Sequence, residues 1–285
     1  MSLILENVSH IYGEDTDMAV AALKEVNLEI PDGQFIGLIG HTGSGKSTLI
    51  QHLNGLLQPT KGTIYFNGQD INEKSYNRKE LRSKVGLVFQ YPEHQLFEVT
   101  VFQDVCFGPK NLGLEQKEVE MRAYKALKQA GVKEELFYHS PFDLSGGQKR
   151  RVAIAGVLAM EPQVLILDEP TAGLDPAGRD EILGQIKKLQ KETKITVILV
   201  SHSMEDVAEY VDRIIVMNRG EVLFDDMPKE VFKECKKLEE VGLAAPQVTY
   251  IMNSFIKEGF LTSSEATTIQ EAKEEILSFL KKKKG

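Results

Sequence analysis

The 285-residue sequence predicts an α/β protein built on a largely parallel sheet. Three apolar runs of strand length support this prediction: FIGLIG at 35–40, VLIL at 164–167 and ITVILV at 195–200. Continuous runs of this kind are typical of strands that are buried on both faces. The segment at about 177–191 has a helical pattern, so the last two strands are expected to be joined by a crossover helix.

Composition excludes several classes of protein. Hydrophobic residues make up 42% and charged residues 27%, which suits one large domain with a small appendage, or two modest domains. The net charge of −8 argues against a nucleic-acid partner. Cys106 and Cys235 are far apart and are expected to be reduced thiols of a cytosolic protein. The N-terminus does not have the pattern of a signal peptide, and the longest apolar runs are too short to span a bilayer, so we expect any membrane role to depend on a partner.

Strands and helices are predicted to alternate along the chain. The first 35 residues predict short strands, and KGTIYFNGQDI at 61–71 predicts another. The pattern from about 93 to 160 is helical. Within it, one helix is expected to carry an apolar face formed by Met121, Tyr124, Ala126, Leu127 and Ala130. RIIVMNRGEVLF predicts a hairpin around residues 218–220.

A compositional shift near residue 235 predicts a division into domains at 1–235 and 236–285. Pro246 is expected to begin a helix that ends at Gly259. Thr268 and Glu271 could form a capping box for a final helix. The expected apolar stripe of the first helix comprises Val248, Ile251, Met252, Phe255 and Ile256.

A phosphate-binding loop is the strongest local feature. GHTGSGKST fits G-x-x-x-x-G-K-[ST] and lies between a predicted buried strand and an amphipathic helix. Its glycines allow backbone N–H groups to point at phosphate oxygens, and the helix N-terminus adds a positive pole. Lys46 is expected to reach the β- and γ-phosphates of ATP, and the Ser47 hydroxyl to bind Mg²⁺. The loop residues expected to bind nucleotide are Gly40, His41, Thr42, Gly43, Ser44, Gly45, Lys46, Ser47 and Thr48.

The run VLILDE supplies the second half of a phosphoryl-transfer site. Two carboxylates follow four apolar residues, at the end of the strand where open α/β sheets bind ligands. Asp168 is suited to hold Mg²⁺, and Glu169 is suited to polarise the attacking water. An apolar strand that ends in two acids can be purely structural, but its company with a phosphate loop favours the catalytic interpretation.

LSGGQKRR forms a third feature. Its glycines permit close approach of another backbone, and Ser145 can cap a helix whose N-terminus could bind an anion. The residues expected to contact nucleotide here are Ser145, Gly146, Gly147 and Gln148.

The order GHTGSGKS, VFQ, LSGGQ, VLILDEP, GLD and SH resembles that of the nucleotide-binding subunits of ABC transporters, over about residues 1–230. The resemblance implies an ATPase with a RecA-like P-loop core, an antiparallel β subdomain and an α-helical subdomain at about 93–160. It also implies that LSGGQ faces the γ-phosphate bound by a second subunit, so that function requires a dimer.

The resemblance assigns roles to four more residues, each of which would have an ordinary structural explanation on its own. Gln90 would contact Mg²⁺ and water and sense the membrane partner. His202 would contact the γ-phosphate, so that Glu169, His202 and Gln90 are the catalytic set. Asp175 would lie at the subunit interface, and Tyr12 would stack on adenine.

Two segments resemble one branch of the family, the energy-coupling-factor (ECF) ATPases. YPEHQLFEVTVFQDVCFG resembles their Q-x-P-E-x-Q-L-F run, and VGLAAPQVTYIMNSFIKEG resembles their C-terminal helical dimerisation segment. GHTGSGKSTLIQHLNGLLQPTKG looks like the second of their two paired ATPases. The resemblance implies uptake of a vitamin or metal ion, with the ATPase at the cytoplasmic face of the cell membrane, and leaves homodimer and heterodimer open.

The ECF resemblance also implies the partners: a second ATPase, a transmembrane coupling subunit and, indirectly, a substrate-binding membrane subunit. Glu93, Glu98 and Asp104 are the expected counter-charges for arginines of the coupling subunit. The main alternative is an ATPase of another ABC importer or exporter. ABC proteins of DNA repair are disfavoured because no long coiled coil separates the motifs.

Overall fold

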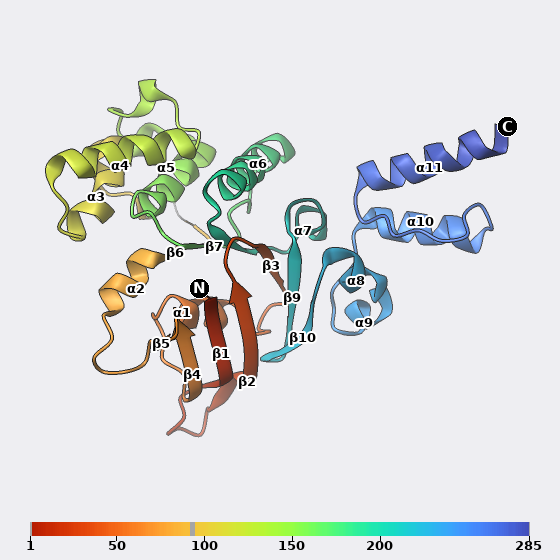
Figure 1. Cartoon of the computed structure of the whole chain (residues 1–285), viewed down its shortest axis with the longest axis horizontal. Helices are drawn as coiled ribbons and strands as arrows, with labels where there is room; N and C mark the ends of the chain where they lie inside the picture. The colour runs from red at the N-terminus through yellow and green to blue at the C-terminus, as the bar shows by residue number, and fades with distance from the viewer. Residues whose placement is uncertain (1, 92–94, 285) are drawn as a thin grey trace.

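The structure, a computed structural model, describes residues 2–91 and 95–284. Within these residues the larger sheet has six strands, in the order β10-β9-β3-β8-β7-β6 (Figure 1). Neighbours from β9 to β6 pair in parallel, and β10 pairs antiparallel at one edge. The strands are, in that order, β10 (Glu221–Asp226), β9 (Arg213–Asn218), β3 (Phe35–Ile39), β8 (Thr196–Val200), β7 (Val164–Asp168) and β6 (Val85–Val88). The predicted α/β fold with a largely parallel sheet is therefore confirmed.

An antiparallel sheet shares a hydrophobic core with α1 and one face of the larger sheet. In the described ranges it has four strands, in the order β2-β1-β4-β5. They are β2 (Val20–Pro31), β1 (Ser2–Tyr12), β4 (Lys61–Phe66) and β5 (Gln69–Asp70). This sheet corresponds to the antiparallel β subdomain that the family resemblance implies.

The central strands are buried on both faces, which explains their continuous apolar sequences. In β3, Ile36 and Leu38 belong to the core shared with α1 and the antiparallel sheet, whereas Phe35 and Ile39 belong to the core shared with the helices on the other face. Successive side chains of a strand point to opposite faces, so every position must be apolar when both faces are covered.

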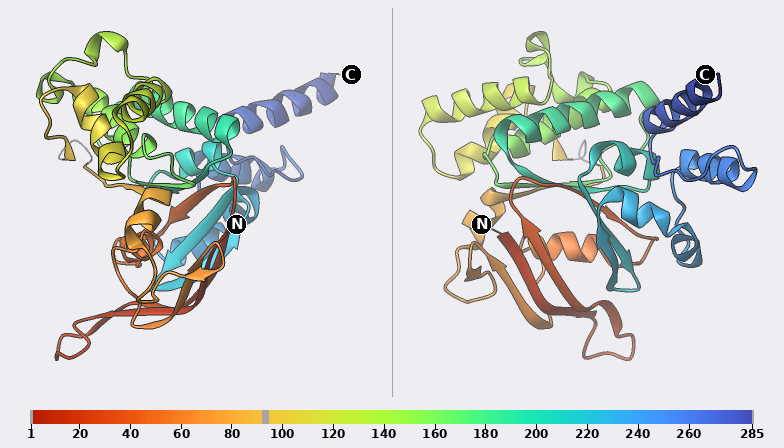
Figure 2. Two further views of the ribbon diagram at one scale, coloured as in Figure 1. Left: turned by 60° about the vertical axis from the view of Figure 1, so that its left-hand side comes forward. Right: turned by 45° about the vertical axis from the view of Figure 1, so that its right-hand side comes forward.

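Helices cover both faces of the parallel sheet (Figures 1 and 2). On one face lie α1 (Lys46–Leu53) and α2 (Arg78–Lys84); the helical layer on the other comprises α3 (Val101–Asn111), α4 (Gln116–Gln129), α5 (Gly146–Leu158) and α6 (Pro176–Thr193). Helix α6 is the predicted crossover. The apolar face predicted for α4 is wrong at Met121 and Tyr124, which are 57% and 46% exposed. The buried residues of α4 are Val119, Ala123, Ala126 and Leu127.

The C-terminal part extends beyond the edge of the sheet that carries β10 (Figure 1). This part consists of α10 (Gln247–Lys257) and α11 (Ile269–Lys284). Three short helices come before it in the chain: α7 (Met204–Tyr210), α8 (Pro228–Lys233) and α9 (Cys235–Glu240). Met252, Ala266 and Ala272 form a small core of their own. Leu238 and Leu243, in contrast, pack into the main core. We therefore propose that the C-terminal unit begins near Pro246 rather than at residue 236.

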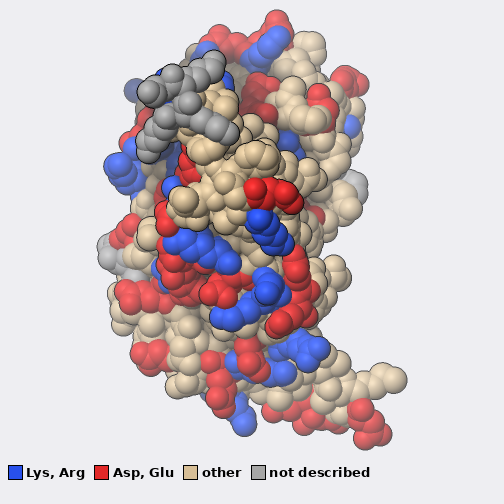
Figure 3. All heavy atoms as spheres, turned by 90° about the vertical axis from the view of Figure 1, so that its right-hand side faces the viewer, with Lys and Arg blue, Asp and Glu red and all other residues tan. Residues whose placement is uncertain are grey.

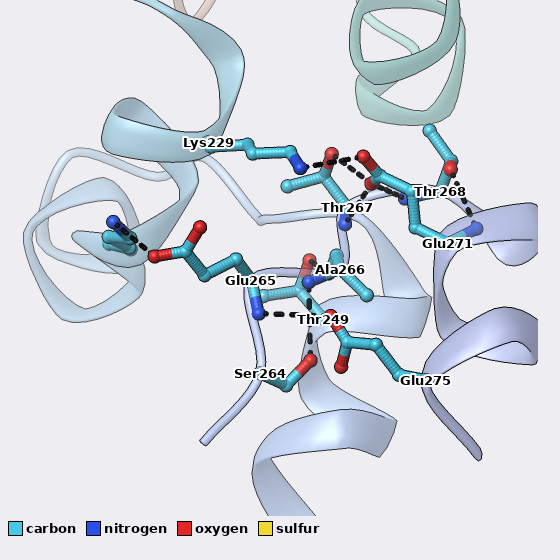
Figure 4. A network of polar contacts seen from close by, with 10 residues as sticks. Lys229, Thr249, Ser264, Glu265, Ala266, Thr267, Thr268, Glu271 and Glu275 are labelled. Atoms are coloured by element: carbon cyan, nitrogen blue, oxygen red, sulfur yellow. Dashed lines mark hydrogen bonds and ion pairs between the residues drawn. The ribbon is translucent and has the colours of Figure 1, made fainter. Parts of the chain in front are cut away.

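Polar contacts anchor this C-terminal unit to the main domain (Figure 4). The predicted capping box is confirmed, because the Thr268 hydroxyl accepts from the Glu271 N–H, and the Glu271 carboxylate accepts from the Thr268 N–H. The other oxygen of Glu271 lies 2.9 Å from Lys229 Nζ on α8. A second ion pair joins Lys233 to Glu265 at 3.1 Å. Charges of both signs are interspersed over this side of the molecule (Figure 3).

The Glu271 carboxylate stabilises the docked unit at neutral pH. Burial raises its pKa, but the Lys229 ammonium and the backbone amides outweigh burial and lower the pKa to about 2. Because this folded-state pKa lies below the ordinary value of 4.5, the stabilising contribution is present above that value and is lost as the pH falls toward 2.

We predict that Glu271→Gln loosens the C-terminal unit. The change removes a helix cap and an ion pair, which together stabilise a partly exposed site by about 0.5–1 kcal/mol. Hydrogen exchange of the α11 amides, followed by mass spectrometry, should become about two- to fivefold faster. Glu274→Gln is the matched control, because the contact that Glu274 makes among the described residues is with Gln270 of the same helix. Equal exchange in the two variants would contradict the anchoring role.

Candidate active site

The candidate site lies where the carboxyl ends of neighbouring parallel strands meet. Strand β8 lies between β3 and β7, and Val200 at its end pairs with Leu38 on one side and Asp168 on the other. The phosphate loop follows β3, the two acids close β7, and His202 follows β8. The edge of an open α/β sheet thus gathers motifs that are far apart in sequence.

Close backbone contacts require glycine at two positions of the phosphate loop. Gly40 has φ +155°, and a Cβ there would lie 2.4 Å from the Met217 carbonyl oxygen. Gly45, which precedes α1, has φ +103°, and its Cβ would lie 2.5 Å from the Ala22 carbonyl oxygen. Any side chain would therefore displace the loop. The buried Ser44 hydroxyl has no hydrogen-bond partner among the described residues, as expected of a loop that takes a polar ligand.

Lys46 is held beneath this loop. Its Nζ donates to the carbonyl oxygens of Gly40 at 2.6 Å and His41 at 3.1 Å. Burial lowers the pKa of the ammonium, whereas Glu169 and Asp168 raise it. A buried cation beside an anion-binding loop is suited to neutralise phosphate charge.

Three strands contribute to the environment of Glu169. The residue has φ +50°, and its N–H donates to the Val200 carbonyl oxygen at 3.0 Å. One carboxylate oxygen accepts from Gln90 Nε2 at 3.0 Å. The other lies 2.8 Å from His202 Nε2. The structure therefore brings together the three residues predicted to be catalytic, and the Glu169 carboxylate lies between the other two.

Asp168 is a partly buried carboxyl group beside a second one, Glu169, a setting that a bound cation would stabilise. Burial raises the pKa of its carboxyl group and the adjacent Glu169 raises it further, while Lys46 and His202 lower it. The oxygen-bearing side chains of Ser47, Asp168 and Gln90 are the kind that Mg²⁺ prefers. The residues predicted to bind Mg²⁺ thus fit a hard divalent ion in their chemistry and in their charge.

The signature segment begins α5 with the predicted cap. Ser145 Oγ accepts from the Gln148 N–H, and Gln148 Oε1 accepts from the Ser145 N–H at 2.9 Å. None of the hydrogen bonds among the described residues joins Ser145 or Gln148 to the phosphate loop of the same chain. A Cβ on Gly146 would meet nothing within 4 Å, and one on Gly147 only a side-chain carbon of Leu174 at 3.8 Å. Packing within this chain therefore does not require either glycine.

Tyr12 and Asp175 occupy the borders of the site. Tyr12, at the end of β1, is 43% exposed, and its hydroxyl lies 3.2 Å from Thr48 Oγ1 of the phosphate-loop helix. Asp175 caps α6, because its carboxylate accepts from the Gly178 N–H at 3.1 Å.

Arg150 is a site residue that the sequence analysis missed. It is buried within α5, and its guanidinium donates to the carbonyl oxygens of Pro170 at 3.0 Å and Ala172 at 2.7 Å. It therefore ties the signature helix to the segment that follows Glu169. In the sequence it is one of three consecutive basic residues, a pattern that does not distinguish a buried arginine from solvated ones.

A largely apolar groove of about 470 Å³ lies between residues 95–97 and helices α2, α3 and α5, with Lys79 and Arg82 of α2 in its lining. Its lining includes Phe97, Phe107, Gly156 and Met160. The rings of Phe97 and Phe107 meet edge to face at 4.8 Å. Phe97 and Phe107 are 57% and 42% exposed, so the groove presents aromatic surface to solvent.

The expectation that Asp104 faces a partner as a counter-charge is wrong. Its carboxylate is buried and accepts from the backbone N–H groups of Phe97 and Glu98, both at 2.9 Å. Burial raises the pKa of Asp104, while these two amides lower it. Asp104 thus holds the wall of the groove in place. Glu98 is partly exposed, and Glu93 lies outside the described residues.

Comparisons with known proteins agree with this geometry. The family model described as ABC transporter matches residues 23–172. The chain is 57% identical to the energy-coupling factor transporter ATP-binding protein EcfA2 of Caldanaerobacter subterraneus subsp. tengcongensis over 281 residues, 99% of this chain and 98% of the relative. It is also 57% identical to the protein of that name from Clostridium tetani, over 99% of each chain.

The chain belongs to the ABC transporter family, among the ATP-binding proteins of energy-coupling factor transporters. This membership confirms the ECF assignment and the predicted ATPase class. In keeping with the prediction of the second paired ATPase, both relatives are named EcfA2.

Solved structures agree with the ABC ATPase fold. CbiO1 from Clostridium perfringens, described as part of the ABC transporter complex cbiONQ, matches with a TM-score of 0.75 and 43% identity, over 88% of this chain and 98% of that one. The ATP-binding cassette MJ0796, dimeric and bound to ADP and phosphate, matches with a TM-score of 0.70 and 33% identity, over 79% of this chain and 98% of that one. In the described part of the chain, no helix combines the length and apolar character needed to cross a membrane.

We predict that Glu169→Gln nearly abolishes turnover while ATP still binds. The amide keeps the size of the side chain but cannot polarise water, and a positioned general base contributes roughly 10²–10⁴-fold to rate. Phosphate release by the assembled complex should fall by that factor, whereas calorimetry should give a similar affinity for ATP. Glu192→Gln, which alters an exposed pair on α6, is the control and should behave as the wild type. Normal phosphate release by Glu169→Gln would exclude Glu169 as the base.

Proposed function

We propose that this chain binds and hydrolyses ATP with Mg²⁺ as one ATPase of an ECF-type importer, at the cytoplasmic face of the membrane. The observation that carries the proposal is the position of Glu169 between Gln90 and His202, on the same sheet edge as Lys46. This arrangement places a general base beside a phosphate-binding loop, which is the requirement for hydrolysis of a phosphoanhydride.

Within this proposal, the loop residues from Gly40 to Thr48 bind the phosphates, and Lys46 contacts the β- and γ-phosphates. Ser47, Asp168 and Gln90 hold Mg²⁺, which neutralises negative charge on the phosphates when it is bound. Glu169 orients and polarises the attacking water. His202, which lies 2.8 Å from the Glu169 carboxylate, contacts the γ-phosphate once nucleotide is bound.

The signature residues act on nucleotide bound by a partner ATPase. Gly146 and Gly147 have room for side chains within this chain, so the surface that they leave open is suited to a group that approaches closely from outside. The capped N-terminus of α5 is suited to face the γ-phosphate of the partner's nucleotide. Asp175, at the start of α6, lies at the same interface in this proposal.

The groove lined by Phe97 and Phe107 takes a helix of the transmembrane coupling subunit. Its aromatic walls and small residues fit an amphipathic helix. Gln90 connects the two sites, because residues 95–97 of the groove lining follow it closely in the sequence and its side chain contacts Glu169. A membrane partner in the groove can in this way influence the geometry of hydrolysis. The transported substrate is a vitamin or metal ion, selected by a separate membrane subunit.

We predict that Gly156→Phe prevents assembly with the coupling subunit. A Cβ at Gly156 meets nothing within 4 Å, so the new ring fills the groove without disturbing the fold. When the chain is expressed with its coupling subunit, the membrane fraction should contain less than about a tenth as much of the variant as of the wild type. This factor corresponds to a loss of about 1.4 kcal/mol in the free energy of binding to the coupling subunit. Its affinity for ATP should be unchanged.

Gly184→Phe is the matched control for this experiment. Gly184 lies within α6, and a Cβ there also meets nothing within 4 Å, but it is not part of the groove lining. The control should reach the membrane normally. Normal recovery of Gly156→Phe would show that the groove is not the docking site. Failure of the wild type to associate with any membrane subunit would contradict the transport function itself.

The C-terminal unit is proposed to hold the two ATPases together when nucleotide is absent. Ile251, Ile269 and Leu277 on α10 and α11 are 53%, 79% and 45% exposed. Ile251 and Leu277 line a groove of about 920 Å³ between this unit and helices α6 and α7. Apolar side chains on adjacent helices are suited to pack against an equivalent pair.

We predict that a chain ending at Ala245 associates at least tenfold more weakly without nucleotide. Burying one such side chain stabilises an interface by about 1.5–3 kcal/mol. Light scattering should show the loss of dimer, while circular dichroism shows a folded monomer, because the main core is intact. Ile251→Ser with Leu277→Ser in the full chain should give the same shift. Unchanged mass distributions in both variants would contradict the proposal.

A further inference from the structure

Three aromatic rings form a column behind the proposed nucleotide site. The His52 ring meets the His10 ring edge to face at 4.7 Å, and the His10 ring meets the Tyr12 ring edge to face at 4.6 Å. His10 and Tyr12 lie on β1, whereas His52 lies on α1, the helix that the phosphate loop begins. The hydrolytic mechanism described above uses neither histidine.

His52 forms the inner end of the column. It is fully buried, and its Nδ1 lies 2.7 Å from the Thr48 carbonyl oxygen, so this nitrogen carries the proton. Burial lowers the pKa of the ring, the Thr48 carbonyl raises it, and the nearby His10 lowers it. The buried Nε2 has no hydrogen-bond partner among the described residues. The ring is thus fixed at one nitrogen and packs against its neighbour at the other side.

His10 connects this buried ring to Tyr12. Its Nδ1 donates to the Gln58 carbonyl oxygen at 3.1 Å, which fixes the plane of the imidazole. Thr48 closes the arrangement, because its carbonyl oxygen accepts from His52 and its hydroxyl lies 3.2 Å from the Tyr12 hydroxyl. Both ends of the column are therefore attached to one residue in the first turn of α1.

We infer that His10 and His52 are positioning residues that hold the Tyr12 ring against the purine base of the nucleotide. The inference rests on the proposed ATPase function and on the role that the family resemblance gives Tyr12, which is to stack on adenine. A tyrosine at the end of a strand, 43% exposed, loses rotational freedom when it stacks on a base. A column that fixes the ring beforehand removes part of this cost, so the base binds more tightly. The phosphates should gain little, because the column meets the phosphate loop only at Thr48, whose backbone α1 already holds in place.

Calorimetry with ATP and with inorganic tripolyphosphate, each with Mg²⁺, tests this inference. Tripolyphosphate occupies the phosphate loop but has no base. His10→Ala should weaken ATP binding about two- to tenfold, the factor that an aromatic pair contributes, and should leave tripolyphosphate binding unchanged. His10→Phe keeps the ring and should restore most of the ATP affinity. His52→Asn, which keeps a donor for the Thr48 carbonyl but loses the ring, should also weaken ATP alone.

Two controls separate this inference from the function on which it rests. Tyr12→Ala removes the platform itself, and His139→Ala alters an exposed histidine of the helical layer and should have no effect. If Tyr12→Ala weakens ATP binding but His10→Ala and His52→Asn do not, the positioning role is overturned and the platform stands. Weakening of both ligands by the histidine variants would mean that they merely support α1. Unchanged ATP binding in Tyr12→Ala would overturn the platform and the positioning role together.

Discussion

The parallel register of β3, β8 and β7 is the constraint on which the rest of the site depends. Parallel pairing places the carboxyl ends of these strands on one edge of the sheet. The pairing of Val200 with Leu38 and Asp168 sets how the strands are aligned along their length. Because both faces of the sheet are covered, a shift of one strand by one residue would exchange the side chains that fill the two cores and draw polar residues at the strand end into the sheet. The energy of the core therefore fixes the relative positions of Lys46, Asp168 and His202.

Glu169 shows how this scaffold is used. Its positive φ costs about 1 kcal/mol for a residue with a side chain. The backbone bond to Val200 and the contacts with Gln90 and His202 hold it in that conformation. Strained backbone at a functional residue is common where the conformation directs the side chain toward its task. Residues 95–97 of the groove proposed for the coupling subunit follow Gln90 closely in the sequence, so a change at the groove can reach the contact between Gln90 and Glu169.

Much of this arrangement could be predicted from the sequence, because the motifs encode local geometry. The phosphate loop, the acids that close β7 and the capping boxes at Ser145 and Thr268 each follow from a few neighbouring residues. The burial of particular side chains could not be predicted in this way. Asp104 has the sequence of a surface acid, but it accepts from two amides of a loop that folds back over it.

Other differences have the same cause. Tyr124 fits the apolar stripe of α4 by spacing, but its hydroxyl donates to Glu134 at 2.7 Å and the ring lies at the surface. Arg150 is buried because carbonyl oxygens beyond the acids of β7 accept from it. The two histidines behind Tyr12 come from β1 and α1, and no local pattern brings them together. Tertiary contacts decide each of these cases.

The most direct test of the account is a crystal structure of the Glu169→Gln chain with ATP and Mg²⁺. We expect Lys46 Nζ to leave the carbonyl oxygens of Gly40 and His41 and to contact the phosphates. We also expect His202 to turn from residue 169 to the γ-phosphate, and Ser145 of a second chain to face that phosphate. A nucleotide bound away from the phosphate loop, or one that leaves Lys46 on the Gly40 carbonyl, would contradict it.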